Sequence, residues 1–154
     1  MNESTLHVVG TGEDRFGEKR PIGDHFVHFR VGTAETGGRL FIAENVFYDK
    51  AGPARHLHHD QDEWFYVLEG KFAFEVGDQK FMLQPGDSLL GPRRIPHVWG
   101  FTGGGTGRLL VSFAPAGKIE ASFREITSRD SRSLDDPKLW SENGMELLGP
   151  PLFV

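Results

Sequence analysis

The stretch Gly52-Pro-Ala-Arg-His56-Leu-His58-His-Asp-Gln-Asp-Glu63 carries most of the information in this chain. In a β-strand, residues two apart project from the same face, so His56 and His58 would point the same way, with Leu57 opposite. The polar residues after His58 can form a turn, and Glu63 opens an apolar run that predicts a buried strand. A strand, a turn and a second strand would therefore bring Glu63 beside the two histidines.

A second stretch, Gly86-Asp-Ser-Leu-Leu-Gly-Pro92-Arg-Arg-Ile-Pro-His97, ends in another histidine. His97 would have to reach the first group from a third strand, which requires a closed or sandwiched sheet. Three imidazoles and one carboxylate suit a first-row transition ion better than calcium or magnesium. We therefore predict that His56, His58, Glu63 and His97 bind one divalent transition metal ion per chain. Fe, Mn, Ni, Co, Cu and Zn all remain open.

With these residues the chain resembles the cupin superfamily, in particular the small single-domain bacterial cupins. The first cupin motif reads G-x5-H-x-H-x3/4-E-x6-G, and the segment from His56 to Gly70 fits it. Gly52 departs from the motif, because it precedes His56 by three residues rather than five.

The second cupin motif reads G-x5-P-x-G-x2-H-x3-N, and the chain matches it at Gly86, Pro92 and His97. Arg94 stands where the motif has glycine, and Phe101 stands where it has asparagine. All four predicted ligand positions are retained. The resemblance implies an all-β fold, a double-stranded β-helix or jelly-roll barrel, of the quercetinase-like, cupin-2 type.

The order of expected elements agrees with such a barrel. We expect strands at residues 4–9, 25–31, 39–47, 64–69, 72–76, 80–83, 88–90, 98–101 and 108–114. Residues 1–154 would form a single cupin domain with a barrel core at about 20–117. Residues 118–154 would form a short helical C-terminal extension, with helices near 118–127 and 135–140, and its apolar end must pack on the barrel or on a partner subunit.

Composition excludes several classes of function. The chain has 154 residues and no cysteine, which rules out disulfides and thiolate ligands. Its formal net charge of −5, without a dense basic cluster, argues against nucleic acids and membranes as partners. We find no apolar span and no signal peptide, and expect a cytoplasmic protein. The apolar strands of the chain suggest a homodimer, and the resemblance to cupins, which are often dimeric, implies the same.

Strand alternation predicts which side chains surround the metal. If Glu63 faces inward, so do Phe65 and Val67, and if His97 faces inward, so do Trp99 and Phe101. These four aromatic and aliphatic residues would line a small-molecule pocket. The competing interpretation is that they simply fill the core. The remaining histidines, His7, His25, His28 and His59, are expected to be surface or structural residues.

The resemblance also suggests a chemistry. In quercetinase-like cupins the ligating glutamate can loosen from the metal and act as a base, a role that falls here on Glu63. The leading hypothesis is a metal-dependent dioxygenase-like enzyme that uses O2 and a small aromatic or enolic substrate. The alternatives are a redox-neutral isomerase or lyase, and a cupin that binds a small molecule without catalysis.

Overall fold

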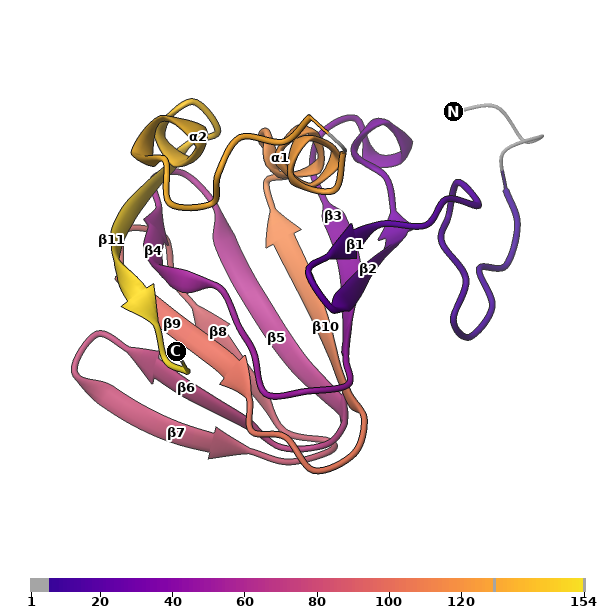
Figure 1. Cartoon of the computed structure of the whole chain (residues 1–154). Coiled ribbons are helices and arrows are strands. Elements are labelled where there is room, and N and C mark those ends of the chain that lie inside the picture. The colour runs from indigo at the N-terminus through magenta and orange to yellow at the C-terminus, as the bar shows by residue number, and fades with distance from the viewer. Residues whose placement is uncertain (1–5, 129, 154) are drawn as a thin grey trace.

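Two antiparallel β-sheets face each other in this computed structural model, which describes residues 6–128 and 130–153 (Figure 1). The six-stranded sheet has the order β1 (Pro21–Ile22), β2 (His25–Val31), β3 (Phe41–Phe47), β10 (Gly107–Ala114), β5 (Asp62–Glu69) and β8 (Ser88–Gly91). The five-stranded sheet has the order β11 (Met145–Pro151), β4 (Ala54–His58), β9 (His97–Phe101), β6 (Phe72–Val76) and β7 (Gln79–Leu83). The predicted all-β jelly-roll barrel is confirmed.

The inner faces of the two sheets bury most of the phenylalanines. In β10, Leu109, Val111 and Phe113 are buried, and the residues between them are more exposed, which is the period-two pattern of a half-buried strand. Seven phenylalanines are fully or almost fully buried: Phe29, Phe41, Phe47, Phe65, Phe72, Phe74 and Phe101. Large rings from both sheets therefore fill the barrel interior, as the small size of the barrel requires.

Helices α1 (Ile119–Ile126) and α2 (Pro137–Ser141) lie at the same end of the barrel (Figure 1). A short 3-10 helix (Thr33–Thr36) connects β2 to β3. Helix α2 begins at Asp136, whose side chain accepts a hydrogen bond from the Lys138 backbone N–H at 3.0 Å, and Pro137 occupies its first turn. No helix among the described residues is long and apolar enough to cross a membrane.

Two local expectations differ from the structure. Residues 6–9 form no strand, while positions 4 and 5 of that expected strand lie outside the described residues. Strand β11 was not expected, yet it pairs with β4 and so places part of the C-terminal segment in the five-stranded sheet. Its sequence contains Gly149 and two prolines, which disfavour the interior of a sheet but are tolerated on an edge strand.

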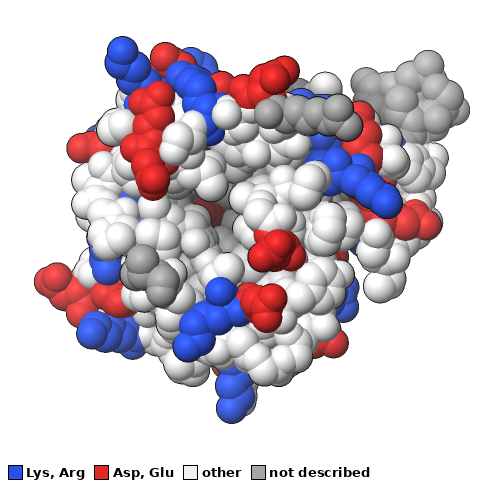
Figure 2. Space-filling model, in the orientation of Figure 1, with Lys and Arg blue, Asp and Glu red and all other residues white. Residues whose placement is uncertain are grey.

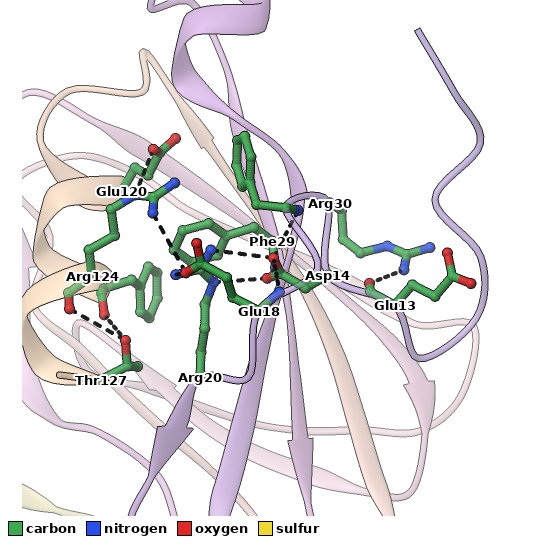
Figure 3. Close-up of polar contacts among 11 residues, drawn as sticks. Glu13, Asp14, Glu18, Arg20, Phe29, Arg30, Glu120, Arg124 and Thr127 are labelled. Carbon is green, nitrogen blue, oxygen red and sulfur yellow. Dashed lines mark hydrogen bonds and ion pairs between the residues drawn. The ribbon is translucent and has the colours of Figure 1, made fainter. Parts of the chain in front are cut away.

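A buried ion pair ties the N-terminal segment to the barrel (Figure 3). The Asp14 carboxylate accepts hydrogen bonds from Arg20 Nε at 2.8 Å and from the Phe29 backbone N–H at 2.8 Å. Burial by itself would raise the pKa of Asp14, but these donors outweigh burial and the pKa is lowered. Arg124 of α1 forms an ion pair with Glu18 of the same segment at 3.9 Å, so α1 is held to this anchor.

Candidate metal centre

The four predicted ligands come from three strands and both sheets. His56 and His58 lie on β4 and His97 is the first residue of β9, so all three belong to the five-stranded sheet. His56 and His97 face each other across the β4–β9 pair. Glu63 comes from β5 in the opposite sheet, because the turn after β4 carries the chain across the barrel. The four side chains meet in the interior.

Their geometry suits one ion. One ligand atom from each of the four residues can be chosen so that all lie within 4.8 Å of one another. Glu63 Oε1 lies 3.6 Å from His58 Nε2 and 3.5 Å from His97 Nε2. Ligands held about 2.1 Å from a metal lie roughly 3 to 4 Å from each other, so these separations need little adjustment. All four residues are buried.

The hydrogen bonds around the cluster leave three ligand atoms available to bind a cation. Each histidine uses Nδ1 toward a protein oxygen: His56 toward Ala54 O at 2.7 Å, His58 toward the Gln61 side chain at 3.0 Å, and His97 toward Ile95 O at 3.3 Å. The atoms His58 Nε2, His97 Nε2 and Glu63 Oε2 are buried without a hydrogen-bond partner. Such orphaned atoms are costly unless something binds them. A divalent metal satisfies all three, so the residues fit the ion.

Protonation states agree with this role for most of the cluster. Burial, reinforced by the neighbouring histidines, lowers the pKa of His56 to about 3, so its ring is neutral at neutral pH. Burial opposes ionisation of Glu63, but the imidazoles of His58 and His97, 3.6 and 3.5 Å from its carboxylate, outweigh burial and hold the Glu63 pKa far below its usual range. Burial would lower the pKa of His58, but Glu63 raises it overall. A metal ion bound at His58 Nε2 would compete with protonation of this atom.

Gln61 fixes the orientation of His58, and the sequence reading had treated it only as part of a turn. Its side-chain amide donates to the carbonyls of Pro115 at 3.0 Å and Ala116 at 2.5 Å. Those two acceptors identify the NH2 end of the amide, so Oε1 faces His58. His58 Nδ1 must then carry the hydrogen, which leaves Nε2 as the lone-pair donor.

The loops around the ligands show how the chain accommodates two of its three motif departures, at Arg94 and Gly52. Arg94, where the motif has glycine, adopts a positive φ of 67° and so keeps the backbone shape that glycine would provide. Its backbone N–H donates to His58 O at 2.7 Å, which ties the loop before His97 to the end of β4. A Cβ at Gly52 would come within 2.1 Å of the Trp99 carbonyl, so this glycine permits close approach of the two segments.

A cavity of about 600 Å³ opens beside the cluster, and His56, His58 and Glu63 line it. Its wall is mainly apolar and comes from β4, β10, α1 and α2, with Val111, Phe113, Ile119, Phe123, Leu139 and Trp140 among its residues. Figure 2 shows a hollow on one face of the molecule, bordered largely by uncharged residues. The ligand cluster is therefore open to a small molecule on one side.

Of the four residues expected to line the pocket, one lies in the cavity wall and three lie in the core. Trp99 lines the cavity. Phe65, Val67 and Phe101 are fully buried and do not line it, which corrects the expectation for these three. They face inward as predicted, but they pack in the aromatic core that closes the barrel behind the cluster. Phe65, for example, lies 5.9 Å from the His97 ring.

The cavity wall also contains residues that the sequence does not predict there. Trp140 of α2 packs against His56, with ring centroids 4.9 Å apart. Asn45, Ser122 and His25 also line the wall, although His25 was expected to be only a surface or structural residue. The sequence contains only weak signals for these residues. The apolar C-terminal segment had to pack somewhere, and Glu44 and Asn45 interrupt an otherwise apolar strand.

Comparison with known proteins finds a family match for the central part of the chain. Residues 47–113 match the Cupin_2 family, described as "Cupin domain". This segment contains all four predicted ligands, and its match agrees with the cupin motifs found in the sequence. An uncharacterised protein of Methanocaldococcus jannaschii is 28% identical over 61 residues, which are 40% of this chain and 49% of that protein. The chain thus matches only about half the length of this relative.

Several solved structures share the fold. An RmlC-like cupin from Shewanella frigidimarina is 24% identical with a TM-score of 0.57, over 67% of this chain and 87% of its own. KdgF from Halomonas is 21% identical with a TM-score of 0.56, over 64% and 87%. A predicted oxalate decarboxylase from Thermotoga maritima is 15% identical with a TM-score of 0.55, over 59% and 80%. At these identities the likeness shows the fold alone.

Proposed function

We propose that this protein is a mononuclear metal-dependent oxidoreductase, of dioxygenase-like type, that acts on a small aromatic or enolic substrate. The observation that supports it most directly is the cluster of three histidines and one glutamate, with orphaned ligand atoms, beside a largely apolar cavity. When bound there, a redox-active divalent ion would supply Lewis acidity and a means of using O2.

Glu63 is the residue that would handle the proton of the substrate. Its carboxylate is held ionised, and Oε2 has no hydrogen-bond partner in the protein. A hydroxyl of an enol or phenol within reach of Oε2 could pass its proton to this atom, which would act as general base. The histidines have their Nδ1 atoms engaged by protein oxygens, so they would keep their places as Glu63 moves.

The cavity wall favours a planar apolar substrate. Trp99, Phe113, Phe123 and Trp140 contribute aromatic surface to the cavity wall. The arginines that flank the ligand stretches do not contribute a positive charge there. Arg55, Arg93 and Arg94 pair with Glu75, Asp62 and Asp60 respectively, and none of the three lines the cavity.

The same wall ranks the alternatives lower. An isomerase or lyase for sugars or hydroxy-acids needs several polar and charged groups aimed at its substrate, and a decarboxylase for a dianion such as oxalate needs cations. Oxalate decarboxylases are among the fold relatives, but this cavity is large, apolar and lacks a lining arginine among the described residues. The other alternative, a protein that binds a small molecule without catalysis, would use the same pocket but release its ligand unchanged.

Elemental analysis of untagged protein, purified without chelators, would test the metal site. We expect near-stoichiometric transition metal in the wild type, its loss in His97→Ala, and no change in His59→Ala, which alters an exposed histidine. Oxygen uptake with flavonols, β-diketones and enolic acids would then test the chemistry. Zinc alone with no oxygen uptake would favour a redox-neutral or binding role, and absence of metal after reconstitution would refute the proposed function.

A further inference from the structure

Three polar side chains in the cavity wall have no hydrogen-bond partner among the described residues. They are Asn45 on β3, Ser122 on α1 and His25 at the start of β2. Asn45 and Ser122 are only 4% and 5% exposed, so neither can turn to bulk solvent. Buried polar groups are normally satisfied by protein, by water or by a ligand.

Strand pairing shows that Asn45 faces the interior. It lies opposite Val27 of β2 and Leu109 of β10, and both of these residues are fully buried in the core. Directly paired residues of antiparallel strands project from the same face of a sheet, so the Asn45 amide must project from the inner face. It therefore enters the cavity from the six-stranded sheet, whereas His56 and His58 enter from the five-stranded sheet.

Ser122 and His25 line the same cavity from α1 and β2 respectively. Ser122 lies three residues after Ile119 and four before Ile126, on the face of α1 that lines the cavity. The His25 ring stacks on Phe47 with centroids 4.3 Å apart. Burial lowers the pKa of His25 to about 4, despite the opposing effect of Asp24, so the ring is neutral at pH 7.

The charges at the opening limit what these groups could bind. Four exposed charged residues line the cavity: Asp24, Asp49, Asp135 and Lys50. Three are acidic, and the amine of Lys50 lies 5.0 Å from the Phe153 ring. An anionic substituent would be repelled by this opening, whereas an amide, a hydroxyl and a neutral imidazole each offer both a donor and an acceptor. They suit a neutral hydroxyl or carbonyl group.

We propose that Asn45, Ser122 and His25, which line the metal-bearing cavity, provide hydrogen-bonding positions for neutral hydroxyl or carbonyl groups of the substrate. This subsite rests on the proposed function, because it takes the metal-bearing cavity as the substrate site. The substrate class narrows to aromatic or enolic compounds that carry a second, uncharged oxygen substituent.

A matched pair of probes tests the subsite. The probes 4-methylphenol and 1,4-dimethylbenzene have nearly the same shape and differ by a hydroxyl in place of a methyl group. Their dissociation constants can be measured by ¹H–¹⁵N chemical-shift titration of the full-length protein, both metal-free and loaded with Zn²⁺. The variants are Asn45→Leu and Ser122→Ala, with Ser112→Ala as control because Ser112 lies on β10 outside the cavity.

We expect the wild type to prefer 4-methylphenol, with shifts at cavity residues. In the metal-free protein, 4-methylbenzoate should bind more weakly than either neutral probe. The preference should fall about fivefold or more in each variant and stay unchanged in the control. An equal preference in wild type and both variants, or no binding of either probe, would overturn the subsite. Failure to take up Zn²⁺ would instead refute the metal function, while the metal-free titration would still judge the subsite.

Discussion

Replacing Gln61 by leucine gives the sharpest test of how the metal centre is built. Gln61 links the ligand His58 to the carbonyls of Pro115 and Ala116, just before helix α1 begins. Leucine keeps most of the volume and removes all three hydrogen bonds. The His58 ring then loses the acceptor that holds its orientation and its Nδ1–H tautomer.

The magnitude follows from which groups are left unpaired. Ala116 O still accepts from the Ile119 backbone N–H at 3.3 Å, but Pro115 O and His58 Nδ1 lose their side-chain partner. Each unsatisfied buried group costs about 1–3 kcal/mol, so losing two partners should lower the free energy of unfolding of the metal-free protein by about 2–6 kcal/mol. Loss of such an orienting partner typically lowers metal affinity about 10- to 100-fold.

Competition with a chelator for Zn²⁺, urea unfolding of the metal-free protein and ¹⁵N spectra of the histidine rings measure the three effects. Gln84→Leu, in an exposed turn, is the control and should change none of them. If Gln61→Leu unfolds more easily but binds Zn²⁺ as tightly as wild type, with His58 in the same tautomer, Gln61 merely supports the turn and the reasoning is wrong.

Three further predictions concern the surrounding structure. Because the His25 pKa is lowered to about 4 in the folded state, His25 contributes stability that is present above pH 6.5 and lost as the pH falls toward 4. His25→Phe keeps the stack on Phe47 but has no ionisable ring. Between pH 6.5 and 4, its unfolding free energy in urea titrations should therefore fall by about 3 kcal/mol less than that of the wild type. Asp14→Asn should lower the unfolding free energy by about 3 kcal/mol or more, because it leaves the buried Arg20 without its carboxylate partner. The control, Asp62→Asn at an exposed ion pair, should lower it by less than about 1 kcal/mol. Arg94→Gly should keep stability within about 1 kcal/mol and Arg94→Val should lose about 1–2 kcal/mol by thermal unfolding, since only the latter strains a positive φ.

The barrel and its ligands could be predicted because both depend on short-range regularities. Alternation in β10 and the His-x-His spacing on β4 reflect the fixed geometry of a strand, in which every second side chain shares a face. The same rule predicts that the Glu63 side chain points inward, once a turn has reversed the chain. The four ligands therefore come together as the spacing predicted.

The cavity wall could not be predicted in the same way. Alternation correctly turned Phe65, Val67 and Phe101 inward, but it carries no information about depth along the barrel. Whether an inward side chain meets a cavity or the core depends on what closes each end. Here Trp140 of α2 closes one side, and β11 joins the sheet beside β4.

The sequence alone predicts a β-barrel with a metal site of three histidines and one glutamate. It can do so because strand periodicity and ligand chemistry are local properties of the chain. Only the tertiary structure decided that Gln61 holds His58, that Arg94 takes the conformation of a glycine, and that Asn45 lies unpaired in the cavity. Those features depend on packing between segments far apart in sequence, where the partner of each polar group is set by the whole fold.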